Sequence, residues 1–248
     1  MSLAPRRLEE LGLNSSAPPA QLLYDGWLLR LSPGKAKRAR SVNAVYPSTL
    51  PLAEKIAYCE RLYAVAGLPA IFRITPFSQP PELEAELARR GYGRFEPTAV
   101  EWAALDDAPA VPEGVHELAI GPWVEAVARL RGSPAGHLAP HRARLEALPL
   151  AKRAVAVEEG GAVVATGLTV VEDGVAGLFD IVTHPQWRRR GLARRIVTAL
   201  LAHAGAFGAR QAYLQVDAAN DPARRLYAGF GFAEAYRYWY LGRPGEQG

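Results

Sequence analysis

Five arginines fall within eight residues of one segment: Arg188, Arg189, Arg190, Arg194 and Arg195. The segment follows an apolar run that ends at Pro185, and it precedes a helix that we expect from Leu192 onward. Where a loop opens a helix, unpaired backbone N–H groups and the positive end of the helix dipole converge. Gly191 allows the backbone to approach a ligand closely, and the arginines add charge-assisted contacts. This combination predicts a binding site for phosphate groups.

The segment differs from the common nucleotide-binding motifs. It lacks the Gly-Lys-Ser/Thr ending of a P-loop and the three spaced glycines of a dinucleotide-binding turn. A magnesium-bound nucleotide is therefore not expected. The net charge of +4 is modest, and the arginines lie in a Gly/Ala loop rather than along a helix face with interleaved aromatic residues. Nucleic acid is therefore not the expected partner.

The elements around this loop predict a mixed sheet. Two strands joined by a Gly-Gly turn are expected within 153–174, and a third strand at 176–185 leads into the loop. A helix with one apolar face, a strand at 211–218, a short helix and a closing strand at 232–241 follow. A strand, helix and strand of these lengths imply a parallel pair with a right-handed crossover, attached to an antiparallel meander. The expected fold class is α/β (α+β).

A separate region precedes these elements. The stretch from Leu105 to Gly114 has no helical or strand period, and we place the boundary there, with domains at 1–108 and 109–248. In the first region, strands are expected at 26–32, 40–47, 70–75 and 98–105, and helices at 52–66 and 82–90. Both regions contain a Gly-aromatic pair, and the glycines of the two pairs, Gly91 and Gly231, are 140 positions apart (231 minus 91). This spacing predicts that the regions are copies of one plan.

The stretch from Asp180 to Phe232 resembles the core of the GCN5-related N-acetyltransferase (GNAT) superfamily. In that superfamily an Arg/Gln-x-x-Gly-x-Gly/Ala loop cradles the pyrophosphate of acetyl-coenzyme A, and Arg188, Gly191 and Ala193 match this loop. A second motif, Asn-x-x-Ala-x-x-Leu-Tyr-x-x-x-Gly-Phe, is filled at every fixed position by Asn220, Ala223, Leu226, Tyr227, Gly231 and Phe232. Two motifs in the right order make residues 113–242 similar to this superfamily.

The resemblance implies a GNAT fold, in which two parallel strands of a mixed central sheet splay apart and admit the pantetheine arm of acetyl-CoA. The arm would pair with the strand at 181–183, where one backbone N–H would polarise the thioester carbonyl. The pyrophosphate would lie on the loop that follows. The cofactor-binding residues expected from the resemblance are Ile181, Val182, Thr183, Arg188, Arg189, Arg190, Gly191, Leu192, Ala193, Arg194 and Asn220.

Two residues are candidates for proton transfer. In the family, the tyrosine at the position of Tyr227 protonates the departing thiolate, whereas simple core packing is the structural alternative for this side chain. The acceptor amine must lose a proton before it attacks, and Asp180 is the nearest carboxylate in the sequence. A strand-end or surface role is the alternative for Asp180. Asn220, ahead of Asp221-Pro222, is also an obvious helix cap.

The first region does not carry this chemistry. At the place of the phosphate loop it has Pro47-Ser48-Thr49-Leu50-Pro51, without arginine or glycine, and its Leu87 stands opposite Tyr227 when Gly91 is aligned with Gly231. We therefore expect a tandem arrangement, with a degenerate N-terminal GNAT-like half and a C-terminal half that binds acetyl-CoA.

Metal and membrane sites are not expected. His137 and His141 have the spacing of a metal pair, but we expect Pro140 to break the helix between them, and no acidic partner completes a zinc motif. Cys59 is expected to be a buried structural thiol. A single cysteine and the lack of a long apolar run favour a soluble cytoplasmic protein without a membrane partner.

The predicted function is N-acetyl transfer from acetyl-CoA to a primary amine of a small molecule or a protein, by direct attack in a ternary complex. Two alternatives stay open. One is a non-catalytic CoA-binding or sensing module, against which Tyr227 argues, and the other is an acyltransferase that uses another acyl-CoA or another nucleophile. The sequence leaves a homodimer open.

Overall fold

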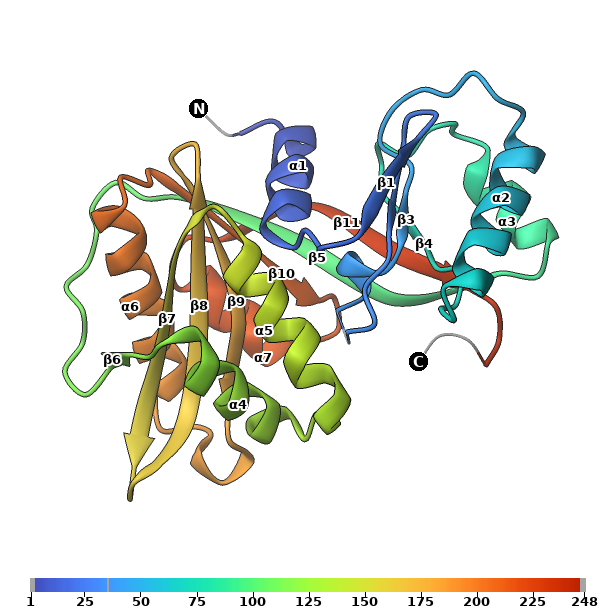
Figure 1. The fold of residues 1–248 in the computed structure, drawn as a ribbon. Helices are drawn as coiled ribbons and strands as arrows, with labels where there is room; N and C mark the ends of the chain where they lie inside the picture. Colours follow the sequence, from blue (N-terminus) through green and yellow to red (C-terminus); the bar gives the residue numbers. More distant parts are fainter. Residues whose placement is uncertain (1–2, 35, 246–248) are drawn as a thin grey trace. The chain divides into compact units, whose positions relative to one another are not determined.

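The computed structural model describes residues 3–34 and 36–245 (Figure 1). The chain divides into two compact units that interleave along the sequence. Of the described residues, unit 1 contains 3–15, 100–216 and 220–235, and unit 2 contains 16–34, 36–99, 217–219 and 236–245. The strands β5 (Gly93–Ala104) and β11 (Ala233–Gly242) contribute residues to both units. The domain boundary expected at residue 108 stays a prediction.

Unit 1 is built on a mixed sheet, as the sequence predicted. Its helices are α1 (Pro5–Ser15), α4 (Ile120–Arg131), α5 (Leu138–Ala147), α6 (Leu192–Ala206) and α7 (Asp221–Ala228). Its further strands are β6 (His116–Glu117), β7 (Ala151–Glu159), β8 (Ala162–Glu172), β9 (Val175–Thr183) and β10 (Gln211–Asp217). The strand order is β5-β10-β9-β8-β7-β6. β7, β8 and β9 pair antiparallel, whereas β9 and β10 are parallel around the crossover helix α6, so the predicted α/β class is confirmed.

Helices cover both faces of this sheet (Figure 1). On one face, Trp123 of α4 packs with Leu168 and Val170 of β8. Gly167 of the same strand faces α6, because a Cβ at Gly167 would lie 2.5 Å from the side chain of Ile196. Since side chains alternate across a strand, α4 and α6 lie on opposite faces. The missing side chain at Gly167 is what allows α6 to lie so close to β8.

The parallel pair separates before either strand ends. The register between β9 and β10 starts at Val175 with Gln211 and stops at Leu178 with Leu214. β9 nevertheless continues to Thr183, and β10 continues to Asp217. From Phe179 onward β9 keeps its pairing with β8 alone. The two strands therefore splay apart, as the resemblance implied.

A bulge in β9 lies just beyond this point. The register with β8 shifts between Thr166 and Leu168, and Asp180 has a φ of +47°. A bulge inserts an extra residue and changes the direction of a side chain. Phe179 packs in the core beside α4, and Asp180 contacts α4 and α5 as well, although strict alternation would put these neighbours on opposite faces.

Two helical segments differ from the expectation. Residues 5–15 form α1, which the sequence pattern had not indicated, and Tyr213 donates a hydrogen bond to Ser15 Oγ at 3.1 Å, within unit 1. The expectation that Pro140 breaks a helix is wrong. Pro140 lies in the first turn of α5, where backbone N–H groups have no intrahelical acceptor, so a proline removes no hydrogen bond there. His137 precedes α5, so it does not share this helix with His141.

Unit 2 has its own hydrophobic core. Its remaining elements are β1 (Gln21–Tyr24), β2 (Trp27–Arg30), β3 (Val42–Asn43), α2 (Leu52–Val65), β4 (Phe72–Ile74) and α3 (Leu83–Arg89). The strand order is β1-β2-β3-β4-β11-β5, and β3 and β4 are parallel around α2. β3 is shorter than the strand expected at 40–47, because Tyr46 N turns to donate to Gly26 O. Cys59 is buried beside Trp27 and Phe72, and burial raises the pKa of its thiol to about 12, which fits a structural role.

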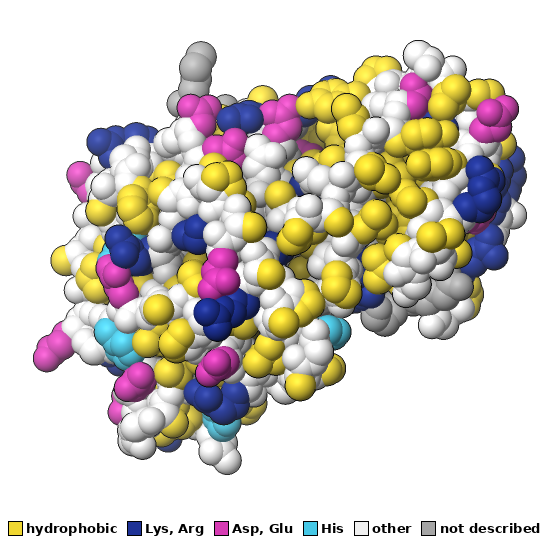
Figure 2. Space-filling view, viewed as in Figure 1, with side chains coloured by type: hydrophobic (Ala, Val, Ile, Leu, Met, Phe, Trp, Pro, Cys, Tyr) yellow, Lys and Arg dark blue, Asp and Glu magenta, His cyan; other side chains and the backbone are white. Residues whose placement is uncertain are grey.

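Most of the exposed large hydrophobic side chains belong to unit 2. Among the described residues these side chains are Leu22, Leu23, Tyr46, Leu50 and Val65 in unit 2, and Val111 in unit 1. Figure 2 shows hydrophobic side chains gathered over the part of the surface that β1 and α2 form. The edge strand β1 of unit 2 therefore exposes two neighbouring leucines, Leu22 and Leu23.

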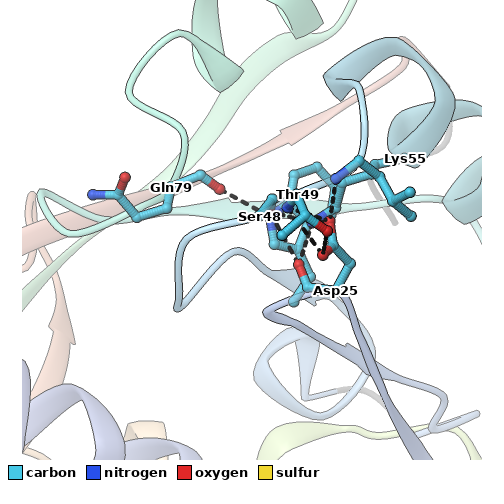
Figure 3. Close-up of polar contacts among 7 residues, drawn as sticks. Asp25, Ser48, Thr49, Lys55 and Gln79 are labelled. Carbon is cyan, nitrogen blue, oxygen red and sulfur yellow. Dashed lines mark hydrogen bonds and ion pairs between the residues drawn. The ribbon is translucent and has the colours of Figure 1, made fainter.

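The segment before α2 binds an anion that the chain itself supplies, the carboxylate of Asp25 (Figure 3). The carboxylate of Asp25 accepts hydrogen bonds from Thr49 N at 3.0 Å, Leu50 N at 2.9 Å and Thr49 Oγ1 at 2.8 Å. Lys55 is fully buried, donates to Ser48 Oγ and lies 3.2 Å from Asp25 Oδ2. The two backbone N–H groups hold the pKa of Asp25 far below its usual range. The N–H groups ahead of α2 are thus satisfied by the chain's own carboxylate.

The two units repeat one arrangement of elements at a spacing close to 140 positions. α2 and α6 begin 140 positions apart (192 minus 52), and so do β5 and β11 (233 minus 93). In both units the helix joins a parallel pair of strands. With this offset, Thr49 and Leu50 correspond to Arg189 and Arg190. The carboxylate of Asp25 therefore binds, in unit 2, the N–H groups that correspond to part of the arginine loop of unit 1.

We predict that Asp25→Asn lowers the free energy of unfolding at neutral pH, and that the deficit shrinks in acid. A carboxyl whose pKa is depressed by folding contributes stability above its unfolded value of about 4, and this contribution is lost as the pH falls through the lower folded value. Urea unfolding between about pH 7 and about pH 2 measures the effect. Glu54→Gln removes an exposed carboxylate from the first turn of α2 and is the matched control. A deficit that is constant over this range would contradict the assignment.

Candidate active site

The loop between β9 and α6 presents backbone N–H groups at the start of a helix. After a short 3-10 turn, Pro185–Trp187, Arg189 has a φ of +61°, and Gly191, the N-cap of α6, has a φ of +76°. Arg195 N donates the first helical hydrogen bond to Gly191 O at 3.1 Å, so the N–H groups of 192–194 have no acceptor in the helix. A Cβ at Gly191 would meet no described atom within 4 Å. This arrangement is suited to binding an anion.

The arginines of the loop differ in what they contact. Arg188, Arg189, Arg190 and Arg194 are exposed. The guanidinium of Arg190 lies 4.6 Å from the ring centroid of Trp187, and that of Arg194 lies 5.1 Å from the ring centroid of Phe230. Arg195 instead donates to the backbone oxygen of Glu113 at 2.5 Å. The four arginines expected to bind the cofactor are thus at the surface of the loop, and Arg195 supports the backbone.

The strand segment at 181–183 borders the gap in the β9–β10 ladder. Val182 pairs with Thr166 and Thr183 pairs with Ala165 on the β8 side. On the other side, the ladder to β10 has already ended at Leu178. Thr183 Oγ1 is buried and has no hydrogen-bond partner among the described residues. This edge of β9 can therefore pair with an extended ligand that carries amide groups.

Asn220 begins α7, the short helix that follows β10. Its Oδ1 accepts a hydrogen bond from Ala223 N at 3.2 Å, so it caps the helix, as expected from its place before Asp221-Pro222. The side chain is exposed, and the cap uses only its oxygen. A contact between Asn220 and a cofactor stays a prediction.

Tyr227 lies near the end of α7 with its ring packed edge-on against Phe232, 6.2 Å between centroids. The residue is 7% exposed. Burial and the charge of Glu101 raise the pKa of Tyr227 to about 12, and the charge of Arg131 partly opposes this rise. The phenol is therefore protonated at neutral pH and can donate a hydrogen bond.

A buried ion pair anchors α7. Glu101 of β5 is 3% exposed and lies 2.8 Å from Arg224 Nε, and Arg224 Nη2 lies 2.8 Å from Glu234. Glu101 Oε2 is buried and has no hydrogen-bond partner among the described residues. The sequence analysis had not singled out Glu101, although a carboxylate in the apolar strand at 98–105 was a signal for it. Its charge is next to α7 and helps to keep Tyr227 protonated.

Asp180, the base candidate from the sequence, lies between two basic side chains. Arg131 Nη2 of α4 is 2.8 Å from Asp180 Oδ1, and His141 Nε2 of α5 is 3.5 Å from Asp180 Oδ2. Burial lowers the pKa of His141, and the charge of Asp180 opposes this change. The sequence relates His141 only to His137, at the spacing of a metal pair, and it does not indicate Arg131, because both residues are far from Asp180 in the sequence.

Metal clusters and membrane spans are absent from the part of the chain that the structure describes. No group of three or more His, Cys, Asp or Glu side chains in that part is placed to hold a metal ion. Within residues 3–34 and 36–245, no helix has both the length and the apolar character needed to cross a membrane.

Sequence comparisons agree with this geometry. The model of the acetyltransferase (GNAT) family matches residues 116–232. YobR, an uncharacterized N-acetyltransferase of Bacillus subtilis (strain 168), is 28% identical over 244 residues, which cover 95% of this chain and 97% of YobR. The mycothiol acetyltransferase of Thermobifida fusca (strain YX) is 35% identical over 92 residues, which are 36% of this chain and 27% of that protein.

Solved structures share the fold over most of the chain. A GCN5-related N-acetyltransferase from Kribbella flavida has a TM-score of 0.68 at 20% identity, with 98% of this chain and 97% of that chain covered. A tandem GNAT protein from the clavulanic acid biosynthesis pathway has a TM-score of 0.62 at 17% identity, with 92% of this chain and 86% of that chain covered. At these identities the likeness concerns the fold.

The family match includes the arginine loop, the splayed strands and α7. The expected GNAT fold is confirmed by the mixed sheet and by the structural neighbours. Residues 116–232 are thus a GNAT acetyltransferase family domain, and the chain is an acyltransferase.

Proposed function

We propose that the protein transfers the acetyl group of acetyl-CoA to a primary amine, which attacks the thioester directly in a ternary complex. The observation that carries this proposal is the junction between the open edge of β9 and the start of α6. An edge that can pair with amide groups leads directly into an anion-binding loop. Acetyl-CoA has the same order of chemical groups, an extended arm with two amides joined to a pyrophosphate.

Different residues of the junction would bind different parts of the cofactor. The N–H groups of 192–194 and the exposed arginines would bind the pyrophosphate, since charge-assisted contacts are the strongest hydrogen bonds available to it. The backbone of 181–183 would pair with the pantetheine arm. One N–H of this segment would also donate to the thioester oxygen, where negative charge develops during attack.

Tyr227 would act on the departing sulfur. Its pKa of about 12 lies above the value of about 8.5 for an ordinary thiol, so complete transfer of the phenol proton to a thiolate is uphill. We therefore expect the phenol to stabilise the thiolate by a hydrogen bond, and to deliver its proton as it recovers one from the attacking nitrogen. The result is a neutral thiol and an unchanged tyrosine.

Unit 2 would be a degenerate copy of the GNAT plan. The support is the constant offset of 140 positions between α2 and α6 and between β5 and β11 (192 minus 52, and 233 minus 93). At the corresponding helix start, the carboxylate of Asp25 already binds the backbone N–H groups, and Lys55 is turned onto Asp25 and Ser48. The N–H groups of Thr49 and Leu50, which correspond to Arg189 and Arg190, would therefore not be open to a second anion. The buried Leu87 stands where unit 1 has Tyr227.

The proposed reaction is tested with acetyl-CoA and a panel of amines. The panel consists of a polyamine, an amino sugar, a peptide with a free α-amine and a lysine-containing peptide, and free thiol release is measured. We expect at least one amine to give saturable turnover. If the protein binds CoA tightly and acetylates none of them, a non-catalytic CoA-binding module is favoured instead.

We predict that Gly191→Glu abolishes CoA binding without unfolding the protein. A glutamate there places a side chain and a negative charge beside the N–H groups of 192–194, so affinity should fall by about a hundredfold or more. Titration calorimetry measures the affinity, and the melting temperature measures folding. Gly191→Asn is the control for the positive φ, because asparagine tolerates this conformation.

The matched variant in unit 2 is Pro51→Glu. Pro51 is the exposed N-cap of α2 and corresponds to Gly191 at the offset of 140 positions (191 minus 51). We expect this variant to bind CoA as the parent does. An equal loss of affinity from Pro51→Glu would contradict the view that unit 2 is degenerate.

We predict that Tyr227→Phe slows acetyl transfer by on the order of 10² to 10⁴, because it removes the proton donor and keeps the ring that packs on Phe232. Single-turnover rates at saturating acetyl-CoA are the measurement, since product release can mask the chemical step. CoA affinity and melting temperature should stay near those of the parent. A rate within about threefold of the parent would show that Tyr227 only packs.

A further inference from the structure

Three side chains outside the two sequence motifs meet where β9 and β10 separate. Asp180 lies two residues beyond Leu178, the last residue of β9 that pairs with β10 (180 minus 178). Its carboxylate is 2.8 Å from Arg131 Nη2 and 3.5 Å from His141 Nε2. The charge of Arg131 acts on both Tyr227 and His141, since it lowers the pKa of each. Both side chains are therefore within electrostatic reach of one guanidinium.

The carboxylate of Asp180 is a fixed anion rather than a good proton acceptor. One oxygen forms a close ion pair with Arg131, and protonation would give up this charge-assisted contact. The backbone at Asp180 is held in a bulge with positive φ, which directs the side chain toward α4 and α5. Asp180 can therefore orient and stabilise a neighbouring cation.

The imidazole of His141 has the opposite properties. Its side chain is 22% exposed, and its ring packs edge-on against Trp123 at 5.9 Å between centroids. Burial lowers the pKa of His141; Asp180 on β9 opposes this, and Arg144 on α5 and Arg131 on α4 reinforce it. The ring is therefore neutral at pH 7 and can take up a proton. The carboxylate 3.5 Å away then stabilises the imidazolium.

We propose that His141 accepts the proton of the acceptor ammonium group, that Asp180 positions the imidazole, and that Arg131 holds Asp180 in place. This inference rests on the proposed acetyl transfer. It places the proton acceptor on α5, as His141, whereas the sequence had suggested Asp180 of β9.

The ammonium form of the acceptor loses one proton to the imidazole, which becomes imidazolium and later releases the proton to solvent. The free amine attacks the thioester carbon, the C–S bond breaks, and an amide bond forms. The attacking nitrogen loses its second proton as the amide forms, and the departing thiolate takes up one proton through Tyr227. One proton is released for each acetyl group transferred.

The test compares pH profiles of kcat/KM for the fastest amine of the panel. For the parent we expect kcat/KM to fall in acid as His141 becomes protonated, below its ordinary value near 6.5, since its pKa is lowered. His141→Gln should reduce kcat/KM by on the order of 10² to 10⁴ and should remove this acidic limb. Affinity for CoA should be unchanged, because His141 is not part of the arginine loop or of the β9 edge.

Asp180→Asn distinguishes a role of Asp180 in positioning His141 from a merely structural role. The carboxylate raises the pKa of His141, so its removal should shift the acidic limb to lower pH while part of the activity remains. Imidazole ring signals of His141, identified by their loss in His141→Gln, should titrate with the same shift in NMR spectra of the CoA-bound protein. Free imidazole should partly restore the activity of His141→Ala in proportion to its unprotonated fraction.

The matched control is His203→Gln. His203 of α6 is also a partly buried histidine whose pKa burial lowers, and it has a carboxylate partner, Glu117, at 3.7 Å. We expect this variant to keep the rate and the pH profile of the parent.

Three outcomes would overturn the inference. One is a rate for His141→Gln within about threefold of the parent. Another is loss of all activity in Asp180→Asn while His141→Gln stays active, which would make Asp180 the proton acceptor. A parent protein that binds CoA and acetylates no amine would contradict the proposed function itself, and the inference with it.

Discussion

The early end of pairing between β9 and β10 is the constraint on which the rest of unit 1 depends. Two parallel strands joined by a crossover helix ordinarily satisfy each other's backbone groups along their whole length, but here the ladder stops after Leu178 and Leu214. The polar groups beyond that point need another partner, because an unpaired backbone group away from water is costly. α6 begins soon after β9 ends, so the N–H groups of 192–194 follow the open edge of β9 closely along the chain. The bulge at Asp180 and the start of α7 also follow the last β9–β10 pair, toward the carboxyl ends of the two parallel strands. Ligands of α/β proteins commonly bind at these ends.

The two units show how one backbone plan gives two different results through a few side chains. Just before α2, the carboxylate of Asp25 binds the N–H groups of Thr49 and Leu50, and the buried Lys55 neutralises it. At the start of α6, glycine replaces Pro51, and arginines replace Ser48, Thr49, Leu50 and Lys55 at the corresponding positions. The segment before α2 is held by a carboxylate of the chain itself. The loop before α6 instead carries positive charge and N–H groups without an acceptor in the helix, which suits it to an external anion.

The protonation states of Tyr227 and His141 are set by burial and by charges on several different elements. Glu101 of β5 and Arg131 of α4 act on Tyr227 in opposite directions, while Asp180 of β9 and Arg131 act in opposite directions on His141 of α5. In both cases burial is the largest influence, and it favours the uncharged form. A neutral phenol and a neutral imidazole at the same pH are the states that a proton donor and a proton acceptor require. Arg131 connects the two, since it pairs with Asp180 and contributes to the field at Tyr227.

The sequence by itself determined the elements that local patterns encode. The apolar face of α6, the Gly-Gly hairpin, the parallel crossover and the order of the two motifs depend on residues within about 40 positions of each other, so periodicity and turn residues were sufficient. Local geometry was harder to predict: Pro140 fits within α5 because the first turn does not need its N–H, and α1 was missed. Only the tertiary structure decided which side chains meet. Arg131, His141 and Asp180 come from three elements, and Glu101 reaches Arg224 across 123 positions. No local pattern encodes such contacts, because they depend on the strand register, on a bulge that redirects Asp180, and on where the ladder between β9 and β10 ends.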